Sequence, residues 1–473
     1  MDFVLNKTPV TGLQFDADST VLEMLRSRGL TGTKEGCASG DCGACTVMVG
    51  VCDEHGDVGY ETVNACIALT GTLAGKHLVT VEGLVNNGEL HPAQQAMVDK
   101  HGSQCGFCTP GFVMSLANLV QDQSSAPSAN HREMVTSGIS GNLCRCTGYK
   151  PIVDAGVDAL RRNQGVSVFD ENIVASLQAI ESKPADGEYY RPTCLAELDI
   201  LVGKYGRQCI VAGTTDFALE ITQRWNQFER LIDVTRVAEL RQVTDSSTEL
   251  LIGAAVSYTT LEDLFRNQSE PFVHLLQRLG SRQIRNTGTL GGNIANASPI
   301  ADTPPALIVW NALIELRNSS GETRTVRVED FYTGYRQTRL ADDEYIVQIH
   351  IPKVSVEGFH RFYKHSKRLE DDISSVLGTF AFSGDSAELM STRVAFGGMA
   401  AVPVRVKPVE ELLDGRVVDA VLIENACLLL RSELQPMSDV RASASFRMDM
   451  AVEMLDRALL EFAGASLPKV EDL

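Results

Sequence analysis

Eight of the twelve cysteines in this 473-residue chain stand in two closely spaced sets. The first set has the spacing C-x4-C-x2-C with a fourth cysteine further along, and consists of Cys37, Cys42, Cys45 and Cys66. The second set consists of two close pairs, Cys105 with Cys108 and Cys144 with Cys146. Four thiolates can hold either a zinc ion or an iron–sulfur cluster. The cysteines therefore predict metal binding or redox chemistry.

Charge and hydropathy exclude several other classes of protein. The formal net charge of −19 argues against a surface for nucleic acid or anionic membrane, which needs basic patches. No apolar run approaches the length of a membrane span, and the residues after Met1 lack the basic and apolar regions of a secretory signal. We therefore expect a cytoplasmic protein that binds neither nucleic acid nor membrane, in which thiols stay reduced.

Three cysteines of the first set lie in a glycine-dense loop, residues 32–45, and Cys66 follows further along. Glycines permit positive φ and let backbone N–H groups approach sulfur, as a cluster-binding loop requires. The spacing is that of plant-type [2Fe–2S] ferredoxins. Structural zinc usually takes two separated C-x2–4-C pairs, so an iron–sulfur cluster is the favoured interpretation.

The elements around this loop predict a β-grasp domain. Residues 3–5 and 10–15 have the pattern of short strands joined by a polar turn. Thr20 and Glu23 form a capping-box pattern that opens a short helix, which Gly29 should end. A third strand follows the loop at residues 46–49.

Helices are expected around the second set. Thr109 can cap a helix with Pro110 in its first turn, and Thr147 likewise follows its cysteine pair directly, ahead of a helix that starts near Pro151. Two helix N-termini would then face one four-thiolate site, and their dipoles would favour its negative charge. Zinc remains the alternative, because this spacing matches no general cluster template.

Small residues recur in the second half of the chain. Residues 210–216 predict a buried strand running into a tight turn, and residues 250–256 predict another strand. The glycine-rich run at 285–299 could bring backbone N–H groups and hydroxyls close to a phosphate or a ring, although such turns are common. No G-x-G-x-x-G follows a strand, so a Rossmann site has no support. The acidic triplet 370–372 is, by itself, typical of a solvated turn.

At this point the motifs resemble a known family. The segments 34–47, 101–111, 141–149, 291–294 and 396–400 are similar to those of the small iron–sulfur and FAD subunits of bacterial xanthine dehydrogenases, in the molybdenum hydroxylase family. The resemblance spans nearly the whole chain and is most specific in the iron–sulfur motifs.

This resemblance implies an α+β multidomain fold. The expected parts are a β-grasp [2Fe–2S] ferredoxin domain at 1–77, a helical-bundle [2Fe–2S] domain at 78–164, a linker at 165–187, an α/β FAD-binding domain at 188–353 and a C-terminal α/β domain at 354–473, similar to that of carbon monoxide dehydrogenase flavoproteins. It also implies that the first cysteine set ligates the [2Fe–2S] cluster nearer the flavin, and the second set the cluster nearer a molybdenum cofactor.

Further site residues follow from the same resemblance. Gln104 matches the family position that hydrogen-bonds the molybdopterin, and Glu370, Asp371 and Asp372 match an acidic stretch near the flavin. The positions that match FAD contacts are Val211, Ala212, Gly213, Thr214, Thr215, Asp216, Phe217, Leu279, Gly288, Thr289, Gly291, Gly292, Asn293, Ser298, Asp302, Asp372 and Arg405. The remaining cysteines, Cys52, Cys194, Cys209 and Cys427, match no ligand motif and are expected to be ordinary buried residues.

The implied function is that of an electron-transfer subunit. A molybdopterin-binding large subunit would hydroxylate hypoxanthine or xanthine, and electrons would pass through both clusters to FAD, which would reduce NAD+. No residue of this chain would catalyse the hydroxylation. The family suggests a heterotetramer with two copies of each subunit. The alternatives are the same role in an aldehyde, carbon monoxide or other N-heterocycle hydroxylase, or a non-catalytic, zinc-stapled scaffold.

Overall fold

Packing divides the protein into two compact units, which we describe separately. The structure, a computed structural model, describes residues 1–53, 57–86, 88–122, 130–162, 171–180, 188–385 and 388–468. The first unit comprises Met1–Pro192, Cys209–Val234 and Gly280–Gly288. The second comprises Thr193–Gln208, Thr235–Leu279 and Thr289–Leu473. Of the predicted linker 165–187, the structure describes residues 171–180, and the rest lies outside the described residues.

The first unit begins with a β-grasp sheet of order β2-β1-β5-β3-β4, in which β1 and β5 run parallel and the other neighbours antiparallel. Its strands are β1 (Phe3–Leu5), β2 (Thr8–Val10), β3 (Thr46–Cys52), β4 (Val58–Asn64) and β5 (His77–Val79). The predicted strand at 10–15 is wrong: β2 ends at Val10 because the chain turns at Gly12, whose φ is +64° and whose N–H donates to Asp2.

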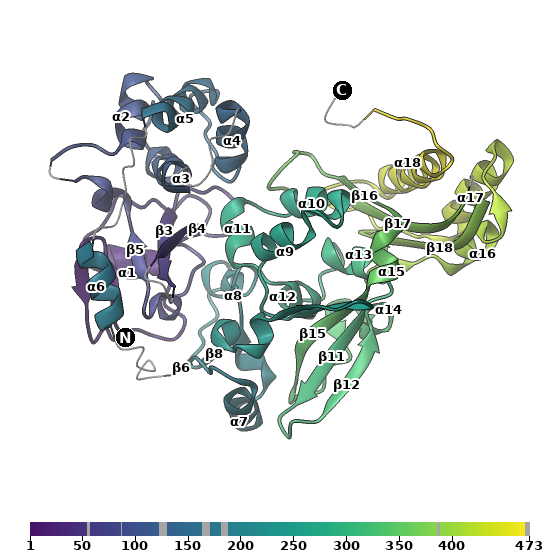
Figure 1. Ribbon diagram of the computed structural model, residues 1–473, viewed down its shortest axis with the longest axis horizontal. Helices are drawn as coiled ribbons and strands as arrows, with labels where there is room; N and C mark the ends of the chain where they lie inside the picture. The colour runs from purple at the N-terminus through teal and green to yellow at the C-terminus, as the bar shows by residue number, and fades with distance from the viewer. Residues whose placement is uncertain are drawn as a thin grey trace. The chain divides into compact units, whose positions relative to one another are not determined.

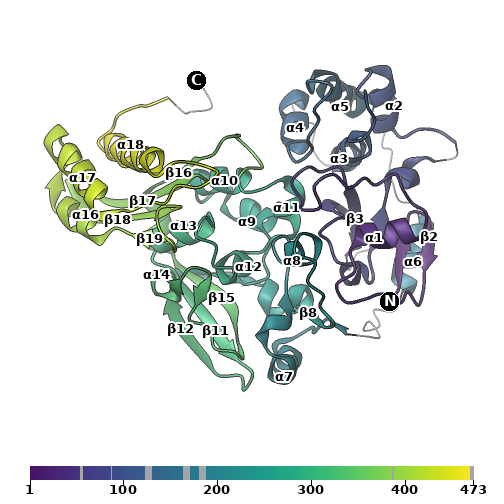
Figure 2. The ribbon, with the colours of Figure 1, turned by 180° about the vertical axis from the view of Figure 1, so that it is seen from behind.

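Helix α1 (Val21–Ser27) packs on one face of this sheet. The predicted capping box is confirmed, because the Thr20 hydroxyl accepts from the Glu23 N–H while the Glu23 carboxylate accepts from the Thr20 N–H. The cap leaves the apolar side of α1 buried in one core with Phe3 and Val47. Figures 1 and 2 show α1 and α6 (Glu171–Ala179) on opposite faces of the sheet.

The helical part of the first unit covers the face of the sheet opposite to α1. Helix α3 contacts β3 and β4, and Phe112 and Leu116 of α3 share a core with Met48 and Tyr60. The helices of this part are α2 (Pro92–Asp99), α3 (Thr109–Asp122), α4 (His131–Gly138) and α5 (Lys150–Arg162). The two predicted helices after the cysteine pairs therefore exist as α3 and α5.

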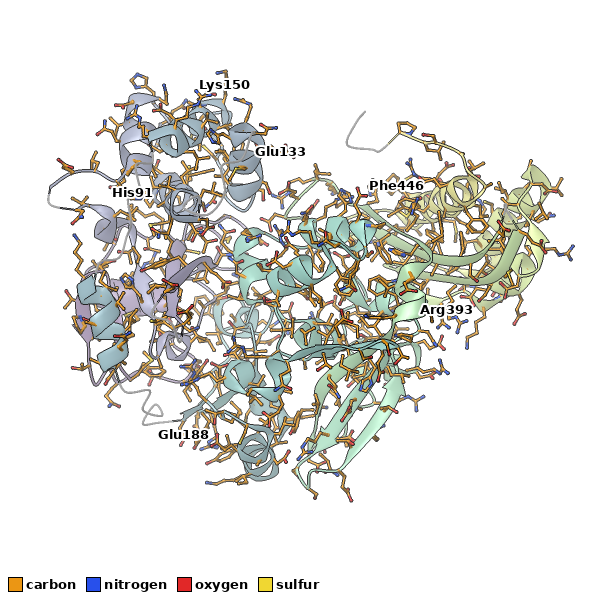
Figure 3. The ribbon with its side chains drawn as sticks, viewed as in Figure 1. His91, Glu133, Lys150, Glu188, Arg393 and Phe446 are labelled. Atoms are coloured by element: carbon orange, nitrogen blue, oxygen red, sulfur yellow. The ribbon has the colours of Figure 1, made fainter. Side chains whose placement is uncertain are left out.

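A buried histidine makes the stability of this helical part dependent on pH. His91, labelled in Figure 3, caps α2 by accepting from the Ala93 N–H, and burial lowers its pKa from 6.5 to about 4. Unfolding restores the ordinary pKa, so protons favour the unfolded chain between these two values. We expect the free energy of unfolding to fall by roughly 3 kcal/mol as the pH drops from about 6.5 to about 4.

Denaturant titrations at several pH values test this expectation. His91→Asn should keep a capping side chain and flatten the pH slope, because asparagine does not titrate in this range. His101→Asn, at an exposed position, should leave the slope unchanged. An equal slope in the parent and in His91→Asn would assign the pH dependence to other groups.

The rest of the first unit comes from later in the chain. A small parallel sheet of order β6-β8-β7 is accompanied by α8 (Ala218–Thr222) and α11 (Arg282–Thr287). Its strands are β6 (Tyr189–Tyr190), β7 (Ile210–Val211) and β8 (Leu231–Asp233). The strand predicted at 210–216 is thus limited to its first two residues, and Thr214, with φ of +59°, lies outside extended backbone.

The second unit contains an antiparallel sheet of order β12-β11-β15-β10-β9 with helices packed beside it. The predicted strand at 250–256 is β10. The elements of this part are α7 (Leu195–Tyr205), β9 (Val243–Asp245), β10 (Glu249–Gly253), α9 (Tyr258–Phe265), α10 (Glu270–Gln277), α12 (Leu290–Ala295), α13 (Thr303–Val309), β11 (Leu313–Asn318), β12 (Thr323–Arg327), α14 (Val328–Phe331), β13 (Tyr332–Gly334), β14 (Gln337–Thr338), β15 (Glu344–Pro352) and α15 (Lys353–Glu357).

The C-terminal part of the second unit is an antiparallel sheet followed by helices. The sheet has the order β16-β17-β18-β19, and β20 pairs with β18. Its core lies between the sheet and α16 to α18, and includes Phe380, Phe396 and Leu455. The elements are β16 (Phe359–His365), β17 (Val376–Asp385), β18 (Glu388–Gly397), β19 (Val404–Arg405), α16 (Lys407–Leu413), β20 (Arg416–Val417), α17 (Ala420–Glu433) and α18 (Ala444–Phe462).

Candidate redox sites

The first cysteine set is gathered in one place by the loop before β3 and the turn after β4. The sulfur of Cys37 accepts from the N–H groups of Ser39 and Cys42 at 3.4 Å each. The sulfurs of Cys45 and Cys66 lie 3.3 Å apart, and both side chains are buried. Backbone N–H groups aimed at sulfur are a feature of iron–sulfur sites, where they help to set the reduction potential.

The conformation of the first loop depends on its small residues. Ala38, Gly40 and Gly43 have φ between +52° and +84°, which turns the chain around the sulfurs. A Cβ atom at Gly36 would lie 2.8 Å from the sulfur of Cys42.

Among the described residues, no group of three or more His, Cys, Asp or Glu side chains is arranged to hold one metal ion. A [2Fe–2S] cluster instead shares four thiolates between two irons.

Three thiols of the first set differ strongly in pKa. The pKa of the Cys37 thiol lies far below its ordinary value because the thiols of Cys42 and Cys66 donate to it. The same hydrogen bonds, together with burial, raise the pKa of Cys42 and of Cys66. Since metal ligation requires thiolates, loading this set must release protons.

The second set is arranged as two pairs at the starts of α3 and α5. Burial and a hydrogen bond to Cys144 raise the pKa of Cys108 to about 12. Burial also raises the pKa of Cys144, but hydrogen bonds from the hydroxyl and N–H of Thr147 outweigh it and lower the pKa overall. The thiol of Cys146 donates to Cys105, which raises the pKa of Cys146.

The helices after these pairs start close to the sulfurs. Thr109 is the first residue of α3 rather than its cap, and its hydroxyl donates to Ser103 at 2.8 Å. The predicted capping role of Thr109 is therefore wrong. The second pair is fixed by Tyr149, whose hydroxyl accepts from the Cys144 N–H at 3.0 Å.

This end of the first unit exposes its sulfurs. Cys105 and Cys146 are exposed, in contrast to the buried Cys45 and Cys66 of the first set. Gln104 is exposed beside them, and the Phe107 side chain is 49% exposed.

The two cysteine loops meet through their backbones. The Leu143 N–H donates to the Cys42 carbonyl at 3.0 Å, which joins the residue before Cys144 to a member of the first set. A Cβ atom at Gly43 would lie 2.2 Å from the Gly141 carbonyl, and one at Gly111 would lie 2.1 Å from the Gly43 carbonyl. We call Gly43, Gly111 and Gly141 the glycine seam.

Part of the predicted flavin set lies in the first unit, namely Val211, Ala212, Gly213, Thr214, Thr215, Asp216, Phe217 and Gly288. These residues are held against the first cysteine domain, because the Thr214 hydroxyl donates to the Ile67 carbonyl at 2.9 Å. Gly213 packs on Thr287, whose carbonyl would lie 1.9 Å from a Cβ atom there. Helix α8 follows directly, and its Thr222 hydroxyl donates to the Ala38 carbonyl at 2.6 Å.

The other part of the predicted flavin set lies in the second unit, namely Leu279, Thr289, Gly291, Gly292, Asn293, Ser298, Asp302, Asp372 and Arg405. The run at 285–299 is not only a turn: it forms the end of α11 and the whole of α12, with Gly288 between the two helices. The Thr289 hydroxyl caps α12 by accepting from the Gly292 N–H, and Asn293 accepts from Thr303. The N-terminal turn of α12 therefore carries the glycines.

Asp302 belongs to a buried polar network in the second unit. Its carboxylate accepts from the Lys364 ammonium at 2.7 Å and from the Ser374 hydroxyl at 2.5 Å. Asp371 is also buried, with φ of +51°, and Asp372 accepts from the Arg368 N–H. The acidic triplet is therefore not the solvated turn that its composition alone suggests, because Asp371 is buried and Glu370 and Asp372 are only partly exposed.

Two predicted flavin contacts have other surroundings. The guanidinium of Arg405 donates to the carboxylates of Glu329 and Glu410, so a flavin contact would require it to leave one of them. Leu279 follows α10 and is half-buried. The roles of both residues stay predictions.

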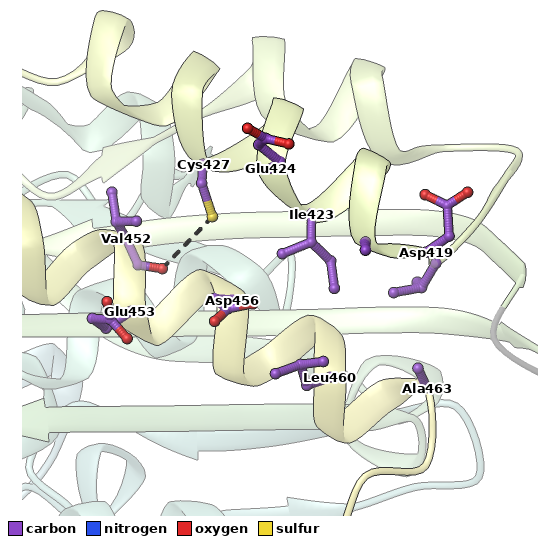
Figure 4. A pocket seen from close by; sticks show the side chains of 11 residues that line it. Asp419, Ile423, Glu424, Cys427, Val452, Glu453, Asp456, Leu460 and Ala463 are labelled. Atoms are coloured by element: carbon purple, nitrogen blue, oxygen red, sulfur yellow. Dashed lines mark hydrogen bonds between the residues drawn. The ribbon is translucent and has the colours of Figure 1, made fainter.

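The cysteines outside the two sets are only partly buried, not fully buried as expected. Cys427 lies in a groove of about 540 Å³ between α17 and α18, where burial and the nearby carboxylates of Asp456 and Glu453 raise its pKa to about 11 (Figure 4). None of the predicted flavin residues lines this groove. The raised pKa makes this thiol a poor nucleophile.

Comparison with known families assigns the cysteine sets. The sequence model of the 2Fe-2S iron-sulfur cluster binding domain matches residues 7–70, and that of the [2Fe-2S] binding domain matches residues 80–156. The model of the FAD binding domain in molybdopterin dehydrogenase matches residues 182–354, and that of the CO dehydrogenase flavoprotein C-terminal domain matches residues 361–462. This chain is an iron–sulfur flavoprotein of the molybdenum hydroxylase family. It carries two [2Fe–2S] domains and an FAD-binding domain, as predicted.

Individual relatives agree with this family. The chain is 31% identical over 495 residues to xanthine dehydrogenase 1 of Arabidopsis thaliana, covering 88% of this chain and 36% of the relative. It is 34% identical over 479 residues to xanthine dehydrogenase of Emericella nidulans, covering 88% and 35%. The chain thus spans about a third of the length of these molybdenum hydroxylase relatives.

Solved structures match a little over half of the chain. A chain of Cu,Mo-CO dehydrogenase aligns with a TM-score of 0.55 and 25% identity, covering 59% of this chain and 98% of its own length. A chain of quinoline 2-oxidoreductase from Pseudomonas putida 86 aligns with a TM-score of 0.52 and 25% identity, covering 59% and 98%. Among the helices that the structure describes, none is long and apolar enough to cross a bilayer.

Sequence reasoning missed the residues that hold the two cysteine loops together. Asn142 stands out in the sequence only as part of a motif, and Gln283 and Ser115 carry no signal. Each is a buried polar residue whose partners lie far away in the sequence. Such side chains can be recognised only when the loops that they join have been placed.

Proposed function

We propose that this chain is the electron-transfer subunit of a cytoplasmic xanthine dehydrogenase. Cys37, Cys42, Cys45 and Cys66 hold the cluster nearer the flavin, and Cys105, Cys108, Cys144 and Cys146 hold the cluster nearer a molybdopterin-binding large subunit. The observation that carries the proposal is the 3.0 Å hydrogen bond between Leu143 and Cys42, which joins the two sets inside one packed unit. When bound, FAD collects single electrons from a cluster and delivers a hydride, which NAD+ accepts.

The chain's own residues give this transfer a direction. The exposed sulfurs of Cys105 and Cys146, with Phe107 and Gln104 beside them, provide the surface for the partner that binds the molybdenum cofactor. The first set is buried, and the flavin segment that begins at Val211 is joined to its domain through Thr214 and Ile67. Electrons that enter at the exposed set therefore reach the flavin through the buried set.

The proposed substrate follows the named relatives. Those relatives are xanthine dehydrogenases, which supports hypoxanthine and xanthine as substrates of the partner subunit. We propose a heterotetramer with two copies of each subunit. The same architecture could serve an aldehyde or another N-heterocycle, as the match to quinoline 2-oxidoreductase illustrates.

Reduction of the purified holo-chain by NADH tests the chain's own part of the proposal. We expect NADH to bleach the flavin absorption and then to reduce both clusters, whereas xanthine alone should reduce neither. In a complex with the large subunit, xanthine should drive the reduction of NAD+ faster than aldehydes or quinoline do. A colourless chain that binds zinc, or reduction by xanthine without a partner, would refute the proposal.

A further inference from the structure

Helix α11 is a surprising member of the first unit. It belongs to the FAD-binding part of the sequence, yet it packs against β4 of the β-grasp sheet. Its Asn286 donates to the Thr62 carbonyl at 2.9 Å, and its Ile284 packs into the same core as Cys45 and Cys66. A short helix from the flavin part is thus built into the structure that carries both cysteine sets.

One side chain of α11 reaches the place where the two cysteine loops meet. Gln283 is only 1% exposed. Its amide donates to the Thr46 hydroxyl at 3.1 Å, with Ser115 and Asn142 oxygens at 3.4 Å. It therefore contacts the strand after the first loop, helix α3 and the second loop at once.

The partners of Gln283 lead directly to the glycine seam. The Gly43 carbonyl accepts from the Thr46 hydroxyl at 2.7 Å and from the Asn142 amide at 2.9 Å. Gly43 lies between Cys42 and Cys45, and Asn142 lies two residues before Cys144. Gln283 is thus linked to the first cysteine set through Thr46 and to the second set through Asn142.

The amide oxygen of Gln283 indicates that this side chain does more than form hydrogen bonds with its neighbours. Its Oε1 is buried and has no hydrogen-bond partner among the described residues. It lies against Gly141, where a Cβ atom would be only 2.2 Å away. An orphaned buried acceptor destabilises a fold, and such groups call for an explanation.

We infer that Gln283 is a positioning residue that sets the separation of the two [2Fe–2S] clusters by joining the loops that carry them. The inference rests on the proposed function, because it assumes that both cysteine sets hold clusters. The FAD-binding part of the chain would then also influence electron transfer between the two clusters, since Gly288 of the predicted flavin set follows α11 directly.

Magnetic resonance of the dithionite-reduced, full-length holo-chain tests this inference. The interaction between the two reduced clusters falls with the cube of their separation and is visible as splitting or faster relaxation of their signals. Gln283→Met keeps the length of the side chain but removes both polar atoms. We expect it to retain both clusters, to weaken their magnetic interaction and to slow electron transfer between them. Gln95→Met, on α2 and away from the seam, should match the parent protein.

The possible outcomes separate this inference from the proposed function. A Gln283→Met protein with both clusters and an unchanged interaction would overturn the inference. If Gln283→Met does not fold, Ser115→Ala provides the test, because it removes the 2.7 Å hydrogen bond to Asn142 from the same network. An unchanged interaction in Ser115→Ala, with both clusters present, would then overturn it. A parent protein without iron would refute the proposed function instead.

Discussion

Cys45→Ala should remove one cluster and interrupt the chain of carriers at a single point. A [2Fe–2S] cluster needs four ligands, and Cys45 is a buried member of the first set whose sulfur lies 3.3 Å from that of Cys66. We expect the iron content to fall from about four to about two atoms per chain, with FAD retained. NADH should then still reduce the flavin, while the remaining cluster should stay oxidised.

Cys108→Ala gives the opposite pattern and completes this test. It should also halve the iron, but NADH should still reduce the surviving cluster of the first set. Cys52→Ser is the matched control, since Cys52 ends the strand that begins directly after Cys45 and belongs to neither set. Iron analysis, visible spectra and spin signals measure all three variants. Equal loss of both clusters from either alanine variant would contradict the assignment of two independent ligand sets.

Gly43→Ala should strongly destabilise the first unit. The φ of +65° at Gly43 disfavours any side chain, and the new Cβ atom would lie 2.2 Å from the Gly141 carbonyl. Backbone strain and overpacking together should lower the free energy of unfolding by about 3 to 5 kcal/mol. Both clusters should become labile, because the substitution separates the loops that carry them.

Gly59→Ala is the matched control for this substitution. Gly59 lies in β4, where a Cβ atom would have no neighbouring atom within 4 Å among the described residues and the backbone does not have positive φ. Its stability should stay the same or rise slightly, because alanine restricts the unfolded chain. Denaturant unfolding and iron release on dilution compare the two variants. Parent-like iron retention in Gly43→Ala would show that the glycine seam does not hold the two loops.

The sequence was informative where function depends on local spacing. The cysteine sets, the capping box at Thr20 and Glu23, and the helices that follow each cysteine pair all depend on neighbouring residues. Such patterns are set by backbone geometry and can be recognised without any tertiary contact. The composition of the run at 285–299 did not show that Thr289 caps α12, or that Gly291 and Gly292 lie in the first turn of that helix.

What escaped prediction depends on contacts between distant residues. Asn142 bonds Gly43 across 99 positions, and Gln283 reaches Thr46 across 237. Nothing in the local sequence of Gln283 distinguishes it from a glutamine on an exposed helix. The burial of Asp371 escaped for a similar reason, because an acidic triplet is usually solvated unless another part of the chain covers it.

The first unit is built from three separate segments of the chain, and this affects the order in which the protein matures. Its last piece, Gly280–Gly288, leaves the ribosome only after two segments of the second unit, Thr193–Gln208 and Thr235–Leu279, have been made. Domains usually fold as units during synthesis, and contacts between distant residues form slowly. The nascent iron–sulfur half therefore waits for α11 with its glycine seam unsupported. We expect a chain that stops at residue 164 to accept iron but to hold it loosely, so stable cluster insertion belongs late in biosynthesis.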